Sequence, residues 1–206
     1  MASIAVNEHV DHHSDDHAHE HHGNFITNYI FSTDHKVIAK QFLITGILWA
    51  IIGGGMSLIF RLQLGFPETQ LEWLKPLLGN WITTSGKLDP EFYLALVTMH
   101  GTIMVFFVLT AGLSGTFSNY LIPLQIGARD MASGFINMLS YWFFFASSVV
   151  MFISIFLETG PASGGWVIYP PLSALPQAMS GSGLGMTMWL VAMALFIVST
   201  LLGGIN

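Results

Sequence analysis

Four long apolar stretches constrain the fold of this chain more than any other feature. They cover approximately residues 39–60, 93–122, 135–157 and 185–203. Each is about as long as the ~20 residues that an α-helix needs to cross a bilayer. Because lipid offers no hydrogen-bonding partner, backbone within it must pair internally, as it does in a helix. We therefore predict an all-α, polytopic bundle of about four transmembrane helices.

The composition supports this prediction. Hydrophobic residues make up 52% of the chain and charged residues only 9%, whereas a soluble domain carries about 25% charged residues. The chain has no cysteine, which excludes disulfides, thiolate-ligated metals and thiol catalysis. The net charge of −6 comes from acidic residues near the N-terminus, so we expect no nucleic-acid partner, which would require a basic surface.

Residues 1–31 precede the first apolar stretch and are predicted to form a disordered, His/Asp-rich tail. Seven histidines alternate with acidic residues there: His9, His12, His13, His17, His19, His21 and His22. The tail is either simply solvated or able to bind Zn²⁺ or Cu²⁺. We expect Ser32 or Thr33 to cap the helix that follows, with Asp34 in its first turn.

The connections between the apolar stretches differ in length and composition. Residues 62–92 are predicted to form a long polar loop and residues 159–184 a Gly/Pro/Ser-rich loop, whereas the link at 123–134 is short. Basic residues are divided equally between the two sides, so their placement sets no orientation. Lys36, Lys40 and Arg129 are expected on one side, and Arg61, Lys75 and Lys87 on the other.

His100 is the residue in these stretches that most needs a chemical explanation. It lies about eight residues, or roughly 12 Å, into the second stretch, too deep for its ring to reach the lipid headgroups. Helical spacing places Met104 and Phe107 on its face, and Gly101 leaves space beside it. The ring either hydrogen-bonds to a neighbouring helix or ligates a haem, for which neutral imidazole is a standard ligand. This helix alone favours haem without establishing it.

Two further polar residues lie near the same membrane surface. Arg61 closes the first stretch and either reaches toward water or donates to the polar edge of a cofactor. Tyr93 precedes His100 by seven residues, which places it on the same helix face, nearer the interface. Its hydroxyl is most simply part of an aromatic belt.

Asp130 is the only carboxylate between the second and third stretches. Asn119 precedes it, and Asn137 and Ser140 follow it on the next helix. An acid at a membrane surface with amides and hydroxyls leading inward is typical of a hydrated proton path. Taken alone, these residues fit an ordinary loop acid with helix caps equally well or better.

Six motifs occur in an order and at intervals that point to one family: "TDHK", "TMHGTIMVFF", "NYLIPLQIGARDMA", "NMLSYW", "GWVIYPPL" and "LLGGIN". Through them the chain resembles the N-terminal part of subunit I of haem-copper terminal oxidases, of the aa3-like cytochrome c oxidase type. The resemblance covers about residues 32–206. The family has about twelve transmembrane helices, and this chain matches the first three and the beginning of the fourth.

The resemblance implies a role for each candidate residue. His100 would ligate the iron of the low-spin haem, Arg61 would contact the edge of that haem, and Tyr93 would belong to the same neighbourhood. Asp130 would open a proton channel that continues through Asn119, Asn137 and Ser140. The Asp130 loop and the N-terminus would be cytoplasmic in a bacterial inner membrane, with residues 62–92 and 159–184 outside.

The implied protein is an enzyme, a cytochrome c oxidase that reduces O₂ to water and pumps protons. Its low-spin haem would be haem A. The high-spin haem and copper B would be held by later helices, so we expect this chain to be a fragment without the oxygen-reducing site. Implied partners are subunits II and III, cytochrome c or a cytochrome c domain, membrane lipid and a respiratory supercomplex.

The chain departs from the family pattern at two places. Many relatives carry a tyrosine where this chain has Phe42, which removes one hydroxyl from the channel mouth. Animal-type relatives bind Na⁺ or Ca²⁺ near the end of the first helix, and Gln63 and Glu68 at the matching positions put that cation site in doubt.

Two alternatives remain. Within the family, a quinol oxidase would carry polar side chains at positions occupied here by Ile52, Met56, Phe92 and Ala95, all apolar. This difference favours cytochrome c as donor. In a different class, the chain would be a small membrane scaffold whose His-rich tail binds metal.

Overall fold

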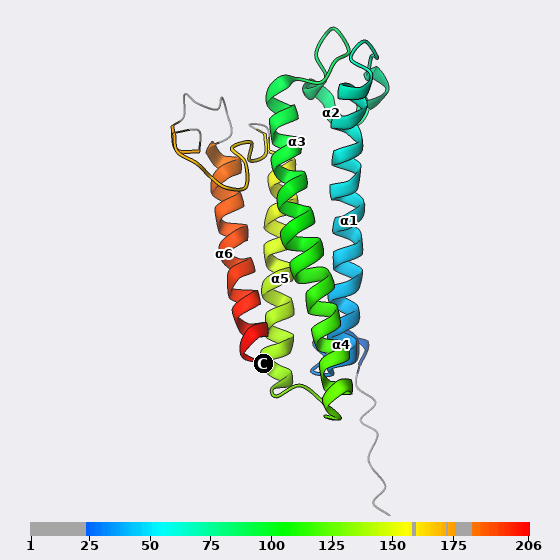
Figure 1. Cartoon of the computed structure of the whole chain (residues 1–206), viewed down its shortest axis with the longest axis vertical. Helices are drawn as coiled ribbons and strands as arrows, with labels where there is room; N and C mark the ends of the chain where they lie inside the picture. The colour runs from blue at the N-terminus through cyan, green and yellow to red at the C-terminus, as the bar shows by residue number, and fades with distance from the viewer. Residues whose placement is uncertain (1–23, 158–159, 172, 176–182) are drawn as a thin grey trace, which may run out of the picture.

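The computed structural model describes residues 24–157, 160–171, 173–175 and 183–206. Four helical segments are long and apolar enough to cross a membrane: α1 (His35–Gly65), the continuous segment Pro90–Ile126, α5 (Gly134–Ile155) and α6 (Gly183–Ile205). They run side by side along the long axis of the molecule (Figure 1). Within the described ranges, the only pairing of strand type is an isolated bridge between Ile82 and Leu88. The predicted all-α bundle is confirmed.

Helix α1 begins one residue later than a cap at Thr33 would place it, and two residues later than a cap at Ser32. Asp34 is the N-cap, and its carboxylate accepts a hydrogen bond from the Lys36 N–H at 2.8 Å. The hydroxyl of Ser32 instead accepts from the backbone N–H of Asp34. The expected cap was therefore wrong, because the Asp34 side chain reaches the free N–H groups of the first turn.

The second span changes its winding along its length. It consists of α3 (Pro90–Thr102), the π-helical segment η4 (Ile103–Ser114) and α4 (Gly115–Ile126). Asp89 caps α3 through two backbone N–H groups, and Pro90 occupies the first helical position, where its missing N–H costs nothing. Gly127, with a φ of 70°, ends α4 in the left-handed conformation that glycine adopts freely.

Small residues bring α1 close to the second span. A methyl group at Gly46 would lie 2.8 Å from the Cα of Gly112, and one at Gly115 would lie 2.8 Å from the Phe42 ring. The apolar core lies beside this crossing, where Phe107 packs against Trp49, Phe144 and Phe196. Close backbone approach through small residues is typical of helices that associate in lipid.

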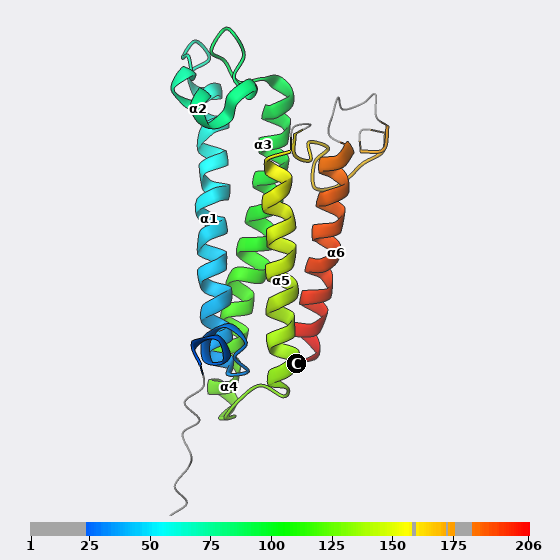
Figure 2. The same cartoon turned by 180° about the vertical axis from the view of Figure 1, so that it is seen from behind.

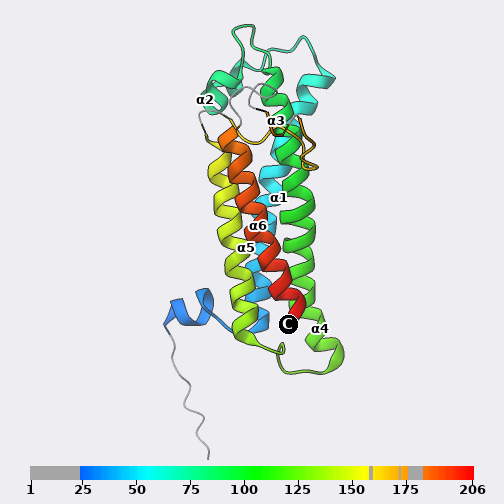
Figure 3. The same ribbon diagram turned by 90° about the vertical axis from the view of Figure 1, so that its left-hand side faces the viewer.

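Helices α5 and α6 lie side by side along most of their length (Figure 3). Hydroxyl groups join them across the interface: Ser147 Oγ donates to the carbonyl of Ala192 at 2.6 Å, and Ser199 Oγ donates to the carbonyl of Ser140 at 2.7 Å. In lipid, such interhelical bonds satisfy hydroxyls that water cannot reach.

The connection after α1 is more structured than the predicted polar loop. It contains three short helices, η2 (Glu72–Leu74), α2 (Lys75–Leu78) and η3 (Gly79–Trp81). Apolar side chains anchor it, since Leu71, Leu74, Ile82 and Leu88 are all buried. The prediction of a loop was wrong because these scattered apolar residues have no periodicity along the sequence yet share one core.

The N-terminal segment, the link between α4 and α5, and Asn206 lie at one end of the bundle, and α2 lies at the other (Figures 1 and 2). We call these the inner and outer ends. The seven tail histidines lie outside the described residues. Ile26–Ile30 form a π-helical turn, η1, within the segment predicted as tail, so regular structure begins before the predicted boundary at residue 31.

Candidate functional site

His100 is held by a backbone carbonyl of the neighbouring helix. It is partly buried near the end of α3, and its Nδ1 lies 2.8 Å from the carbonyl oxygen of Gly53 on α1. A carbonyl can only accept, so Nδ1 carries the proton and donates it. The neutral ring then presents the lone pair of Nε2.

The absence of a side chain at position 53 makes this contact possible. A methyl group on Gly53 would lie 2.9 Å from both Ile103 Cγ2 and Met104 Sδ. The second span therefore sits directly over Gly53, with Met104 and His100 on the same side, as predicted. Phe107 also faces α1, where it is fully buried against Trp49.

Nε2 of His100 forms no hydrogen bond with any described residue, nor is it sealed within the protein. A ring fixed through one nitrogen and open at the other has the arrangement of a metal-ligating histidine, in which an outer partner sets the tautomer and orientation. A histidine serving only to join two helices would need no accessible second nitrogen.

Phe60 links His100 with Tyr93. Its ring meets that of His100 edge-on at 5.6 Å between centroids and that of Tyr93 at 6.0 Å. These contacts confirm that Tyr93 and His100 share a side of the helix. Phe60 was missed from the sequence because one aromatic residue among many in an apolar stretch gives no signal.

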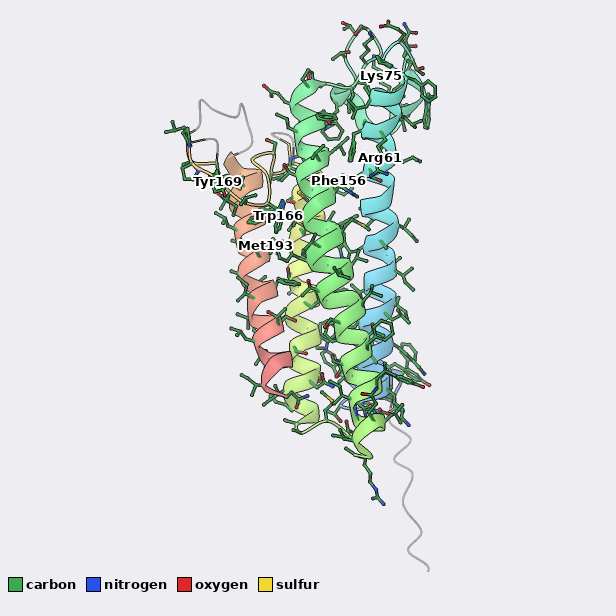
Figure 4. The ribbon with its side chains drawn as sticks, viewed as in Figure 1. Arg61, Lys75, Phe156, Trp166, Tyr169 and Met193 are labelled. Carbon is green, nitrogen blue, oxygen red and sulfur yellow. The ribbon has the colours of Figure 1, made fainter. Side chains whose placement is uncertain are left out.

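Arg61 follows Phe60 and lies toward the outer end of α1 (Figure 4). Its side chain is exposed and forms no ion pair or hydrogen bond within the described part of the chain. The structure therefore places Arg61 on the same stretch of α1 as the Phe60–His100 contact, without joining it to His100.

The position of α3 is fixed by hydroxyl groups on either side of His100. Thr102 Oγ1 accepts from the indole N–H of Trp189 on α6 at 3.0 Å, and Thr98 Oγ1 accepts from the backbone N–H of Gly165 at 3.0 Å. Both threonines are buried. These bonds hold the helix that carries His100 against α6 and the loop before it.

A polar cavity of about 280 Å³ lies near the inner end, between η4, α4, α5 and α6. Three predicted residues line it together, namely Asn119, Asn137 and Ser140, and they are joined by Ser199 and by the ring of Phe42. Nothing in the sequence pattern distinguishes Ser199, which comes from the fourth span.

Two buried amide atoms in this cavity have no partner in the protein. Asn119 Nδ2 donates to the carbonyl of Gly115 at 2.7 Å, but its Oδ1 is unpaired, as is Nδ2 of Asn137. Leaving buried polar groups unpaired is costly. A polar cavity of this volume with free donors and acceptors is suited to hold water.

Asp130 lies outside this cavity and pairs with a histidine that was not predicted. Its Oδ1 lies 3.0 Å from Nδ1 of His35 and accepts from the N–H of Met131 at 2.7 Å. Both residues line an open hollow of about 310 Å³ with Thr33, Asp34, Lys36 and Arg129. Met131 lines the polar cavity, so the carboxylate adjoins the cavity without entering it.

His35 is buried, and its Nε2 also has no partner. The motif that contains it was interpreted as a helix start and as part of the family resemblance, with no role for His35 itself, and the partner of His35 lies 95 positions away along the chain. Within the described ranges, no cluster of three or more His, Cys, Asp or Glu side chains is arranged to hold a metal ion. The structure therefore offers His100 as a single ligand and not a complete metal site.

The positions at which quinol-oxidising relatives would be polar lie together at the outer end. Ile52, Met56 and Phe92 line one further cavity, and Ala95 is buried nearby.

The bundle and its histidine define a class, that of polytopic α-helical membrane proteins with a histidine inside a span whose second ring nitrogen has no partner among the described residues. The chain belongs to the family described as cytochrome c and quinol oxidase polypeptide I, whose model matches residues 37–206. It is a subunit I of the haem-copper oxidase family, and the resemblance seen in the six motifs is confirmed.

Several relatives are similar over most of the chain. The alternative cytochrome c oxidase subunit 1 of Bradyrhizobium diazoefficiens is 39% identical over 87% of this chain. The cytochrome c oxidase subunit 1 of Thermostichus vulcanus is 35% identical over 86%, and the heme-copper oxidase subunit I+III of Aeropyrum pernix is 36% identical over 88%. The matches cover 28%, 28% and 20% of those proteins, so this chain spans less than a third of their length.

Proposed function

We propose that this chain forms the first helices of the catalytic subunit of a respiratory terminal oxidase. In that subunit, electrons would pass from cytochrome c through a low-spin haem, of the A type, to a haem-copper centre that reduces O₂ to water. The reaction would be coupled to proton pumping. The family supports the class of enzyme, and the geometry of His100 is the observation that carries the role of this chain.

The residues around His100 fit an axial ligand of the haem. The Gly53 carbonyl holds the ring by Nδ1 and leaves Nε2 free, which is the nitrogen that would bind iron. Phe60 packs against the ring edge and restricts its rotation. When bound, the haem supplies one-electron redox chemistry. Arg61 can donate to a polar edge of the haem because its guanidinium has no partner among the described residues.

The haem proposal also requires groups that would lie beyond this chain. The second axial ligand, the high-spin haem ligand and the copper B ligands are expected in later helices of the subunit. Subunits II and III would be partners, and the name of the Aeropyrum relative combines I and III in one chain. A cytochrome c domain or a supercomplex would supply electrons.

We further propose that the inner end takes up protons from the cytoplasm. Asp130 is exposed and paired with His35, so this pair can accept a proton from water at the surface. Asn119, Asn137 and Ser140 would hold the water that continues the path, because two of their buried polar atoms are unpaired. On this proposal, the N-terminus would lie in the cytoplasm of a bacterium, with α2 on the outer side of the inner membrane.

The alternatives are a quinol oxidase and a scaffold with a metal-binding tail. A quinol headgroup needs hydrogen-bond partners, and the side chains at the matching positions are apolar. This supports cytochrome c as the donor. The histidines of the tail lie outside the described residues, and the scaffold interpretation does not account for the free Nε2 of His100.

The haem proposal is tested by replacing His100 with leucine in the assembled membrane protein. We expect His100→Leu to lose the low-spin haem absorption band and the corresponding share of bound iron. The variant His35→Gln, which alters the histidine at the inner end, should keep both. A normal low-spin band in His100→Leu would show that this histidine does not ligate haem.

A further inference from the structure

A second cavity lies at the outer end of the bundle, on a different part of α1 from the polar one. Its volume is about 480 Å³, and it lies between α1, α3, the end of α5 and the short helices α2 and η3. Its lining is almost entirely hydrocarbon and aromatic. The α1 residues that line it are Ile51, Ile52, Gly55, Met56 and Ile59.

The chemistry of the lining selects the ligand. Apart from the indole N–H of Trp81, no side chain in it can form a hydrogen bond, and none carries charge. A ligand with a polar head inside this cavity would leave its polar atoms unpaired, at a cost. An acyl chain that moves from the bilayer interior into the cavity instead passes from one apolar environment to another. The shape and packing of the lining then provide specificity.

The rim of the cavity is apolar and open. Ile51 is 67% exposed, Phe156 68% and Leu77 75%. The proposal takes this open side of the bundle to face lipid, so that a chain can enter from the bilayer. In Figure 4, Phe156 lies in the outer part of the bundle, and Lys75 lies farther toward its outer extreme.

Lys75 supplies a cation beside the entrance. It begins α2, immediately before Pro76, which lines the cavity. It is exposed and forms no ion pair with a described residue. A lysine beside the entrance attracts the phosphate of a lipid headgroup.

We propose that this cavity binds a phospholipid, with one acyl chain between α1, α3 and α5 and its phosphate near Lys75. The cavity occupies the positions at which quinol-oxidising relatives would be polar, and here it is a hydrocarbon site. The inference requires that the chain spans a membrane with this side of the bundle facing lipid. It does not depend on the haem proposal, so lipid content and haem spectrum can fail separately.

Gly55 allows a direct test. A Cβ atom added there meets nothing within 4 Å, and because Gly55 lines the cavity, a larger side chain would project into it. The assembled membrane protein is purified in mild detergent, and retained phospholipid is counted by native mass spectrometry. We expect Gly55→Phe to retain one phospholipid fewer than the wild type. The control Gly65→Phe also has open space but lies outside the lining, and it should retain the full number.

Equal phospholipid counts in the two variants would overturn the proposal. So would loss of a bound quinone from Gly55→Phe with phospholipid unchanged, which would assign the cavity to a quinone.

A measurement on the unaltered cavity covers the case in which Gly55→Phe does not fold. The fluorescence of Trp81, taken as the difference between wild type and Trp81→Phe, should be quenched by a phospholipid brominated along its acyl chains. Lys75→Gln should weaken this quenching. Quenching no greater than that of the remaining tryptophans would contradict the proposal.

Discussion

The polar cavity and the apolar cavity belong to the same four-helix bundle, yet side chains of different polarity line them. The inner cavity presents asparagines and serines and leaves two amide atoms unpaired, whereas the outer one presents almost only hydrocarbon. Helix α1 contributes to both, through Phe42 at the inner end and Ile51 to Ile59 at the outer end. The helices that pack against α1, and not α1 itself, therefore decide whether a cavity suits water or lipid.

The two cavities are separated by the closest backbone approach between α1 and the second span. Gly46 lies on α1 between Phe42 and Ile51, and it faces Gly112 directly. Above this crossing, Trp49 and Phe107 pack together. The apolar rings of Trp49 and Phe107 therefore lie between the two cavities along α1.

The largest effect should come from the acid beside the polar cavity. Asp130→Asn removes the proton-accepting carboxylate and weakens its contact with His35. A positioned proton-transfer group contributes at least about 100-fold, so we expect turnover to fall by about that factor and proton uptake to fall with it. Oxygen consumption and proton pumping in vesicles measure both.

The matched control removes one acidic charge at the outer end. Glu72→Gln should leave turnover and proton uptake at wild-type values, because exposed Glu72 lies far from the inner cavity along α1. Normal turnover and pumping in Asp130→Asn would reduce Asp130 to an ordinary loop acid and leave the polar cavity without a proton source.

A smaller effect is expected at the crossing that separates the cavities. In Gly46→Ala, the new methyl group would approach Gly112 Cα to 2.8 Å, so the helices must move apart. Overpacking of this kind costs about 1–3 kcal/mol. A lower midpoint of thermal unfolding in detergent would report it.

Gly65→Ala provides the comparison. Its methyl group meets nothing within 4 Å, and the substitution brings a gain in helix propensity as Gly46→Ala does. We expect its unfolding midpoint to be no lower than that of the wild type. Equal midpoints for Gly46→Ala and Gly65→Ala would show that the crossing is not tightly packed.

The sequence was sufficient to predict the four spans and to select His100, because lipid imposes a length and a polarity that can be read directly. It also selected Asn119, Asn137 and Ser140, which the structure brings to one cavity. It could not identify the Gly53 carbonyl, since every residue has one and only packing decides which is available. The His35–Asp130 pair and the apolar residues of the outer connection depend likewise on contacts between distant positions.

Free imidazole, added in place of the His100 side chain, tests whether His100 is a haem ligand oriented by Gly53. His100→Gly removes the imidazole and leaves a space for it in the assembled membrane protein. We predict that the low-spin haem spectrum disappears in this variant and returns when imidazole is added. A low-spin spectrum that persists in His100→Gly without imidazole would contradict the claim.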